Sequence, residues 1–309
     1  MYMRINWVLV PVLAAAAAVS GIVPDVRKAI ADSDFTRAES LVQKYRAEQG
    51  VTPEMLEALS WLGRGSLAAK QLDKAEHYAK ETQQLAVAEL KKRALDAEPH
   101  LPLALGAAIE VQAIVMNERG ERNDAVAFLR KELAQYRDTS IRTRIQKNIH
   151  LLSLEGKPAP ALQEVEFLGT KPAPLARFRG KPVMLFFWAH WCPDCKADEP
   201  LIAQLRAEYA SKGLVIIGPT QRYGYVARGE EAPPAQELKY IEEVRRQYYK
   251  DLLDMPVPVS EENFKLYGAS TTPTFVFIDT KGIVRQYHPG KMTLEEMRAA
   301  VSKLFNPAT

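Results

Sequence analysis

Phe187-Trp188-Ala189-His190-Trp191-Cys192-Pro193-Asp194-Cys195 is the stretch that decides the fold of this chain, because it holds both cysteines of the protein directly after an apolar run. Residues 183–189 are typical of a buried strand, and residues 196–211 repeat apolar side chains at helical spacing before a stop at Gly213. The cysteine pair is therefore predicted at the point where a strand passes into a helix.

A cysteine at this position is predicted to be reactive. The start of a helix offers unpaired N–H groups and the positive end of the helix dipole, and both favour a thiolate over a thiol whose unperturbed pKa is about 8.5. We therefore expect Cys192 to be an exposed nucleophile. Cys195, one turn further along, is expected to resolve a mixed disulfide by attacking the sulfur of Cys192.

Two other interpretations of the cysteine pair are weaker. Half of a zinc site would need further ligands, and the sequence has neither a second Cys-x-x-Cys motif nor a spaced histidine pair, so no metal is expected. A purely structural disulfide would close so short a loop that it would remove little chain entropy.

Residues 156–305 resemble the thioredoxin superfamily, and more narrowly its TlpA/ResA-like periplasmic thiol-disulfide oxidoreductases. The resemblance rests on Trp191-Cys192-Pro193-Asp194-Cys195, on Pro200 in the next helix and on Thr272-Pro273-Thr274-Phe275 at a later strand. It implies an α/β thioredoxin-like domain, with a mixed central sheet and helices on both faces, that works without a bound cofactor. It also implies that Trp191, Thr272 and Pro273 shape the surface where a partner polypeptide docks.

One departure from the family concerns the proton acceptor. Thioredoxin itself carries a buried acid where this chain has Phe186, so the proton of Cys195 must go elsewhere. Asp198 resembles the position of a glutamate in TlpA/ResA-like sequences, and Glu199 lies beside it. Either carboxylate is a candidate proton acceptor through water. The alternative is that both are exposed first-turn acids that complement the helix dipole.

The residues beside the cysteines bear on the direction of electron transfer. Asp194 places a negative charge near Cys192 and opposes its thiolate, which favours a reductant or a modest exchanger over a strong oxidant. His190 would add a positive charge if protonated, but a lone histidine in a loop is expected to be a surface residue.

An insertion over residues 218–258 is longer than a simple thioredoxin needs, and it is predicted to contain a charged helix over about residues 235–250. Arg222, Tyr223 and Tyr225 lie just after a predicted central strand, at the edge where such sheets place functional loops. We expect these three residues to recognise the partner; a mobile solvent loop is the alternative.

Residues 1–24 have the layout of a secretory leader. Residues 1–4 are basic, residues 5–19 are uncharged and apolar, and residues 14–18 offer Ala-x-Ala cleavage choices. The uncharged stretch, at about 20 residues, is nearly long enough to stay as a membrane anchor. We expect removal of this signal peptide, with retention as an anchor as the alternative. In either case the rest of the chain is expected in the periplasm or another extracytoplasmic space.

Residues 25–155 are predicted to form a first, all-helical domain that resembles tetratricopeptide repeats. Three short segments, beginning at Phe35, Leu72 and Arg122, look like the turn into the second helix of a helical hairpin. In such repeats small alanines let paired helices approach closely. A generic alanine-rich bundle is the alternative. The sequence does not choose between a surface for a partner polypeptide, a subunit contact and a spacer.

The composition is that of an ordinary globular protein with room for two domains after the leader. The 309 residues are 47% hydrophobic and 26% charged, and the net charge is only +3 without long blocks of one sign, so nucleic acid is not an expected partner. The sequence predicts a thiol-disulfide oxidoreductase that exchanges electrons with cysteine-containing proteins and an upstream donor. In the family such exchange serves cytochrome c maturation or general periplasmic reduction. The alternatives are a helical adapter with a redox-sensitive attachment, and a thiol peroxidase, because peroxiredoxins share this scaffold.

Overall fold

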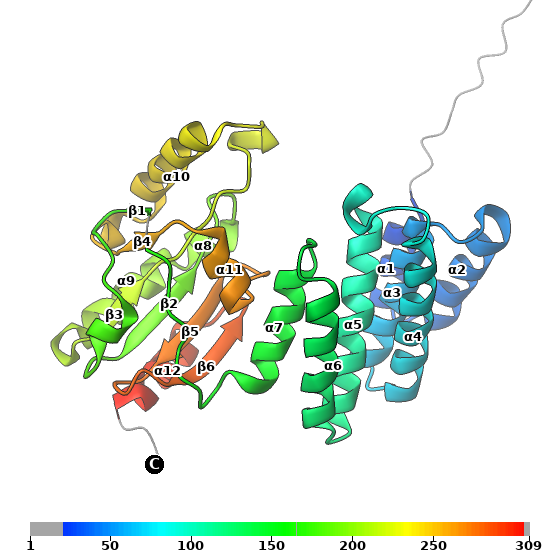
Figure 1. Cartoon of the computed structure of the whole chain (residues 1–309), viewed down its shortest axis with the longest axis horizontal. Coiled ribbons are helices and arrows are strands. Elements are labelled where there is room, and N and C mark those ends of the chain that lie inside the picture. Colours follow the sequence, from blue (N-terminus) through cyan, green and yellow to red (C-terminus); the bar gives the residue numbers. More distant parts are fainter. Residues whose placement is uncertain (1–20, 165, 306–309) are drawn as a thin grey trace, which may run out of the picture.

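The computed structural model describes residues 21–164 and 166–305, which form an all-helical lobe followed by a lobe built on a central sheet (Figure 1). The predicted leader falls mainly on residues 1–20, which lie outside the described residues. Residues 22–24, assigned to that leader by the sequence, belong instead to the first helix, where Ile22 and Val23 are buried against the helical core.

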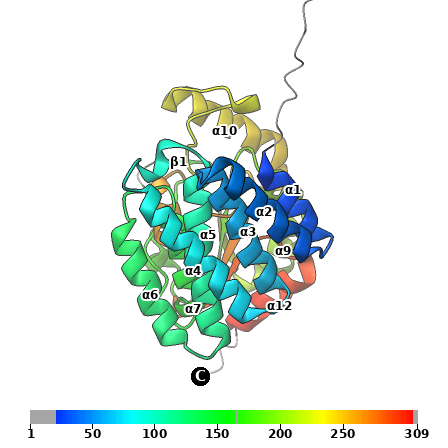
Figure 2. The ribbon, with the colours of Figure 1, turned by 90° about the vertical axis from the view of Figure 1, so that its right-hand side faces the viewer.

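The helical lobe contains seven α-helices and one short 3-10 turn among the described residues. They are α1 (Ile22–Ala31), α2 (Phe35–Gln49), α3 (Pro53–Ala68), α4 (Leu72–Glu89), η1 (Leu95–Ala97), α5 (His100–Glu118), α6 (Arg122–Gln135) and α7 (Arg142–Ser153). The predicted starts at Phe35, Leu72 and Arg122 are confirmed, because α2, α4 and α6 begin at these residues. In Figure 2 this lobe lies in front of the sheet lobe.

The helices of this lobe form two layers. Helices α1, α3, α5 and α7 contact one another in that order, and α2, α4 and α6 pack on them as the second layer. Ala38, Ala75 and Ala125, one near the start of each second-layer helix, are fully buried. Small side chains at these contacts let the helix axes approach closely, as the sequence pattern predicts.

Helix α5 is the one described helix that is long and apolar enough to cross a membrane, with a mean hydropathy of 1.2. However, 61% of that segment is buried inside the molecule. Its apolar character is therefore accounted for by its central place between α3, α4, α6 and α7.

The second lobe is built on a four-stranded mixed sheet. The described part of this lobe has six strands, of which β1 and β4 form a separate two-stranded sheet: β1 (Phe167–Leu168), β2 (Val183–Phe187), β3 (Val215–Ile217), β4 (Val257–Pro258), β5 (Thr274–Ile278) and β6 (Val284–Pro289). The sheet order is β3-β2-β5-β6, in which β2 runs parallel to β3 and antiparallel to β5, and β5 pairs antiparallel with β6. Strand β1 pairs antiparallel with the distant β4.

Helices cover both faces of this sheet, as predicted. The helices are α8 (Pro193–Ala197), α9 (Glu199–Tyr209), α10 (Pro234–Tyr248), α11 (Glu261–Tyr267) and α12 (Leu294–Phe305). Side chains alternate along β2, so that Met184 and Phe186 join the core beneath α9 and α12 while Leu185 and Phe187 join the core beneath α11. The strand is therefore apolar and buried throughout, and it ends directly before the cysteine motif.

The two lobes meet through α7. His150 Nε2 lies 2.8 Å from the carbonyl oxygen of Leu266, and the N–H of Tyr287 donates to Glu155 Oε1 at 3.2 Å. Gly268, with φ of +63°, packs against the backbone of Lys147, and a Cβ there would lie 2.3 Å from the Lys147 nitrogen. These contacts fix the last helix of the first lobe against the sheet.

Candidate functional site

The two cysteines form a disulfide at the start of α8, with their Cα atoms 5.4 Å apart. Cys192 is the N-cap of that helix, and its Sγ accepts a hydrogen bond from the Cys195 N–H at 3.1 Å. This is the strand-to-helix junction that the sequence predicts. Asp198 lies between α8 and α9, and Pro200 is in the first turn of α9, where it has no N–H to continue the helical ladder of α8.

The expectation of an exposed nucleophile is wrong for this oxidised form. Only 2% of Cys192 is exposed, and Cys195 is fully buried. The sulfur of Cys192 is bonded to Cys195 and lies 3.5 Å from the carbonyl oxygen of Thr272, so protein atoms surround it on more than one side. The neighbouring Trp191, by contrast, is 46% exposed.

The loop before β5 faces the disulfide, as the resemblance implies. The Thr272–Pro273 peptide bond is cis, and the carbonyl group of Thr272 is the one beside Cys192 Sγ. The structure thus brings Trp191, Thr272 and Pro273 to the same end of the sheet as the cysteines. An exposed indole beside a sulfur atom and a backbone segment offers a surface on which an extended chain can lie.

Asp198 is the acid that the fold buries near the disulfide. It is 1% exposed, and its Oδ2 has no hydrogen-bond partner among the described residues. Burial raises the pKa of Asp198 to about 6, opposed by Lys291 and reinforced by Asp194. The hydroxyl of Tyr249 is likewise buried without a partner, and burial together with the charge of Asp198 raises the pKa of that phenol.

Glu199 has a different environment. It is also buried, but its Oε1 accepts a hydrogen bond from the N–H of Asp251 at 2.9 Å, at the 3-10 turn η5 (Lys250–Leu252). Of the two candidate proton acceptors, Asp198 therefore has the uncommitted oxygen. The idea that both are exposed first-turn acids does not hold, since neither is exposed.

A cation that the sequence motif does not reveal lies beside the cysteines. Lys291, in the loop after β6, has its Nζ 3.3 Å from Asp194 Oδ1. It offsets the negative charge that Asp194 places near Cys192. The sequence could not predict this ion pair, because Lys291 and Asp194 are far apart in the chain and only the folded sheet brings them together.

His190 is not a surface residue, contrary to the sequence expectation. It is 1% exposed, its Nε2 lies 3.3 Å from Oε1 of the buried Glu237, and burial lowers its pKa against the opposing charge of Glu237. The physical reason is a cage of tyrosine rings contributed by the insertion and α10. The rings of Tyr223, Tyr225 and Tyr240 stand edge-on to the imidazole at 5.4–5.5 Å.

The three residues expected to recognise a partner have separate surroundings. The Arg222 guanidinium pairs with Glu166 and donates to the carbonyl oxygen of Pro234. Tyr223 and Tyr225 belong to the cage around His190, and Tyr223 also packs edge-on to Trp191 at 5.5 Å. Tyr223 thus connects the insertion to the exposed indole, whereas Arg222 holds the insertion to the segment before β1.

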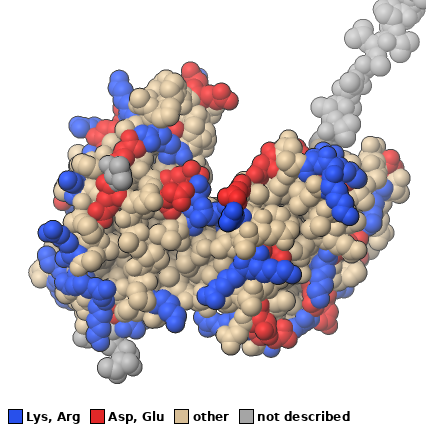
Figure 3. Space-filling view, viewed as in Figure 1, with Lys and Arg blue, Asp and Glu red and all other residues tan. Residues whose placement is uncertain are grey.

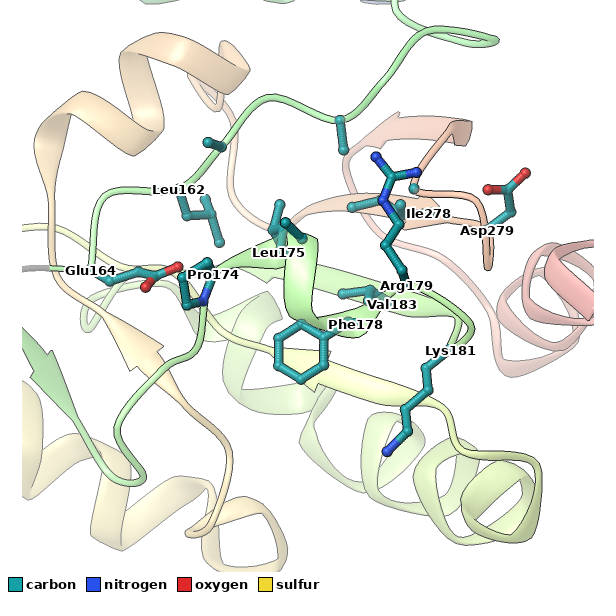
Figure 4. A pocket seen from close by; sticks show the side chains of 14 residues that line it. Leu162, Glu164, Pro174, Leu175, Phe178, Arg179, Lys181, Val183, Ile278 and Asp279 are labelled. Atoms are coloured by element: carbon teal, nitrogen blue, oxygen red, sulfur yellow. The ribbon is translucent and has the colours of Figure 1, made fainter.

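A pocket in the described part of the sheet lobe lies away from the cysteines. It has a volume of about 220 Å³ and is lined by Leu162, Leu175, Phe178, Val183 and Ile278, with Arg179 and Lys181 near its edge (Figure 4). Val183 begins β2, whereas the disulfide follows the end of that strand, so the pocket opens at the opposite end of the sheet. Among the described residues no cluster of three or more metal-ligating side chains is present.

Comparison with known proteins places these features in context. A family model described as a thioredoxin-like domain matches residues 174–305. The chain is 33% identical over 135 residues to the thiol:disulfide interchange protein DsbE of Pseudomonas fluorescens biotype C, covering 44% of this chain and 66% of that protein. It is 31% identical over 152 residues to the thiol-disulfide oxidoreductase ResA of Bacillus thuringiensis subsp. konkukian, covering 48% and 78%. A solved thioredoxin family structure from Chlorobium tepidum TLS matches with a TM-score of 0.37 and 20% identity, over 48% of this chain and 97% of that one.

Proposed function

Because this chain belongs to the thioredoxin-like family of thiol-disulfide oxidoreductases, we propose that it is exported and reduces disulfide bonds in partner polypeptides. The observation that carries the proposal is the placement of Cys192 Sγ at the N-cap of α8, bonded to Cys195. The Cys195 N–H that donates to this N-cap sulfur would stabilise the negative charge on the Cys192 thiolate once the disulfide is opened.

The reaction begins with the reduced chain. The thiolate of Cys192 attacks one sulfur of a partner disulfide; a new S–S bond forms to Cys192, and the second partner sulfur leaves as a thiolate. Cys195 then loses its proton, with Asp198 as the proposed acceptor, and attacks Cys192 Sγ. The partner's remaining sulfur leaves as a thiolate, two electrons have passed to the partner, and the chain is left with the disulfide described above. An upstream dithiol must reduce it again.

The near-complete burial of Cys192 in the disulfide form restricts the directions from which a partner polypeptide can reach its sulfur. A partner's backbone has to approach over Trp191 and the Thr272–Pro273 segment, because these border the sulfur. We propose that they form the docking surface, with Tyr223 supporting the indole from behind.

Trapping tests the exchange directly. The full chain with Cys195→Ser cannot resolve the intermediate, so we expect mixed disulfides on Cys192 to accumulate with a disulfide-bonded polypeptide such as oxidised ribonuclease and to be released by dithiothreitol. The variant lacking both cysteines is the control. The absence of adducts with every disulfide tried would contradict the proposed function.

The direction of transfer needs its own measurement. The charge of Asp194 near Cys192 supports a reductant, although Lys291 partly offsets it. A redox titration against glutathione should therefore give a potential well below that of strong oxidants. A value near or above about −120 mV would contradict the reducing role.

A further inference from the structure

A cleft joins the two lobes next to the loop that carries the cis-proline. It has a volume of about 350 Å³, and its walls include Leu103 of α5, Arg144 and Lys147 of α7, and Ser270 and Thr271 of the sheet lobe. Thr271 directly precedes the residue whose carbonyl group lies beside Cys192 Sγ. The cleft therefore adjoins the proposed docking surface beside Cys192 Sγ, and the first-layer helices form its other wall. Figure 3 shows the molecule hollowed between its two lobes.

The helical wall of this cleft offers one exposed apolar side chain and two cations. Leu103 is 46% exposed. Arg144 and Lys147 both pair with the same carboxylate, Glu110, at 3.0 and 2.9 Å, so two positive charges share one negative charge.

The positive charge continues along the same layer of helices to α3 and α1. Arg64 of α3 lies within electrostatic range of Arg144, Glu110, Glu57 and Arg27; burial and then repulsion by Arg144 lower its pKa to about 10. Glu57 already pairs with His100 Nδ1 at 2.7 Å.

The indole of Trp61 lies between two of these arginines. The guanidinium groups of Arg27 and Arg64 stack on its ring, with their carbons 4.6 and 4.5 Å from the ring centroid. Neither guanidinium forms an ion pair with a residue in the described part of the chain. The Trp61 Nε1 is buried and has no hydrogen-bond partner among the same residues. The N–H donors of Arg27, Arg64 and Trp61, all on this helical layer, thus remain without an acceptor among residues 21–164 and 166–305.

We propose that the helical lobe and the cis-proline loop form one continuous groove, and that its occupant is an extended, acidic segment of the partner polypeptide adjacent to the cysteine that Cys192 attacks. Carboxylates complement the unpaired arginines, since guanidinium groups bind planar carboxylates with paired hydrogen bonds. An apolar side chain of the same segment packs on Leu103. The helical lobe is then part of the substrate site, neither a spacer nor an independent adapter. This inference rests on the proposed function.

Two peptides of equal length test the groove. Each carries one cysteine as a mixed disulfide with glutathione, one with aspartate and glutamate flanking it and a twin with asparagine and glutamine in their places. The reduced full chain should reduce the acidic peptide with a kcat/KM about three- to tenfold higher than its twin, an advantage that falls as salt is raised. Arg27→Gln with Arg64→Gln should remove this advantage, because neither guanidinium forms an ion pair in the described part of the chain that the change would break.

The matched control neutralises two exposed cations of the outer layer, Arg130→Gln with Lys131→Gln on α6, and should keep the preference. Equal rates with both peptides, or a preference that survives the Arg27 and Arg64 changes, would overturn the groove.

Binding separates this proposal from the exchange chemistry. A fluorescent acidic peptide with serine in place of cysteine cannot exchange, yet its anisotropy should show binding to the full chain that weakens about three- to tenfold in the Arg27 and Arg64 variant. If all disulfides remain unreduced while this binding persists, the proposed function fails and the groove stands. If glutathione disulfide is reduced normally while the serine peptide does not bind, the groove fails and the exchange function stands.

Discussion

At the scale of single residues, the uncommitted oxygen of Asp198 leads to a prediction about rate. The carboxyl group can accept the Cys195 proton only when ionised, so resolution should slow as the pH falls below about 6. Asp198→Asn should lower the rate of resolution by about 100-fold at pH 7 and abolish that pH dependence. Stopped-flow measurement of mixed-disulfide decay checks this. Glu199→Gln should lack the effect, since Glu199 Oε1 is bound to the Asp251 N–H; an unchanged pH profile in Asp198→Asn would contradict the role.

The same residue has a consequence for stability. Its pKa rises from 3.8 to about 6 on folding, so the native state holds more protons between these values and the wild-type chain loses stability as the pH rises through that window. Relative to wild type, Asp198→Asn should therefore gain up to about 3 kcal/mol of unfolding free energy between pH 4 and 7. Urea unfolding at both pH values measures the gain, with the exposed Asp251→Asn as control.

Residues of the site differ in how far the sequence could reveal them. Cys192 and Cys195 follow from local spacing, because two residues in one turn of a helix need only that turn to meet. Asp198 follows from its place on the same helix, although its burial does not. Lys291 and Tyr249 could not be found, since they approach the motif only through the folded sheet.

At the scale of elements, the insertion is held by a buried polar contact. Glu237 of α10 accepts hydrogen bonds from the backbone N–H groups of Tyr223 and Gly224 and lies beside His190. Glu237→Ala would remove the acceptor of these two part-buried N–H groups and the carboxylate beside the buried His190, at a cost of about 1–3 kcal/mol. Chemical denaturation should show this loss, together with slower reduction of polypeptides, because Tyr223 packs on Trp191.

The control for this prediction lies on the same helix. Glu243→Ala removes an exposed carboxylate of α10 and should change stability little. Equal effects of the two substitutions would show that Glu237 does not hold the insertion in place.

Elements set by local pattern were predictable, and those set by distant pairing were not. The antiparallel pair β5–β6 follows from two short runs joined by a turn at Lys281-Gly282, and the Thr293 capping box follows from a Thr-to-Glu spacing; the Thr293 Oγ1 does accept the Glu296 N–H at 3.2 Å. The pairing of β1 with β4 joins segments far apart in sequence. The burial of His190 depends in the same way on rings from another element.

At the scale of the whole molecule, the junction of the lobes can be loosened at one position. Gly268→Ala would place a Cβ 2.3 Å from the Lys147 nitrogen at a φ of +63°. Gly156→Ala is a matched control, because its φ is +79° but no atom lies within 4 Å of the added Cβ. Gly268→Ala should therefore cost about 1–3 kcal/mol more than Gly156→Ala. Thermal unfolding compares them, and equal losses would mean that the lobes are not pressed together there.

The order of the first helical layer has a mechanical consequence. Helix α1 lies at one end of the row and α7 abuts the sheet lobe, so three interhelical steps of about 8–10 Å each separate α1 from α7, and the redox centre lies beyond α7. In a chain held by its segment before residue 21, the row of helices alone would place the sheet lobe roughly 25–30 Å from α1, and the reactive sulfur would lie further away. The row of helices would then set the distance between the tether and the sheet lobe, and so limit which partner polypeptides the cysteines can reach.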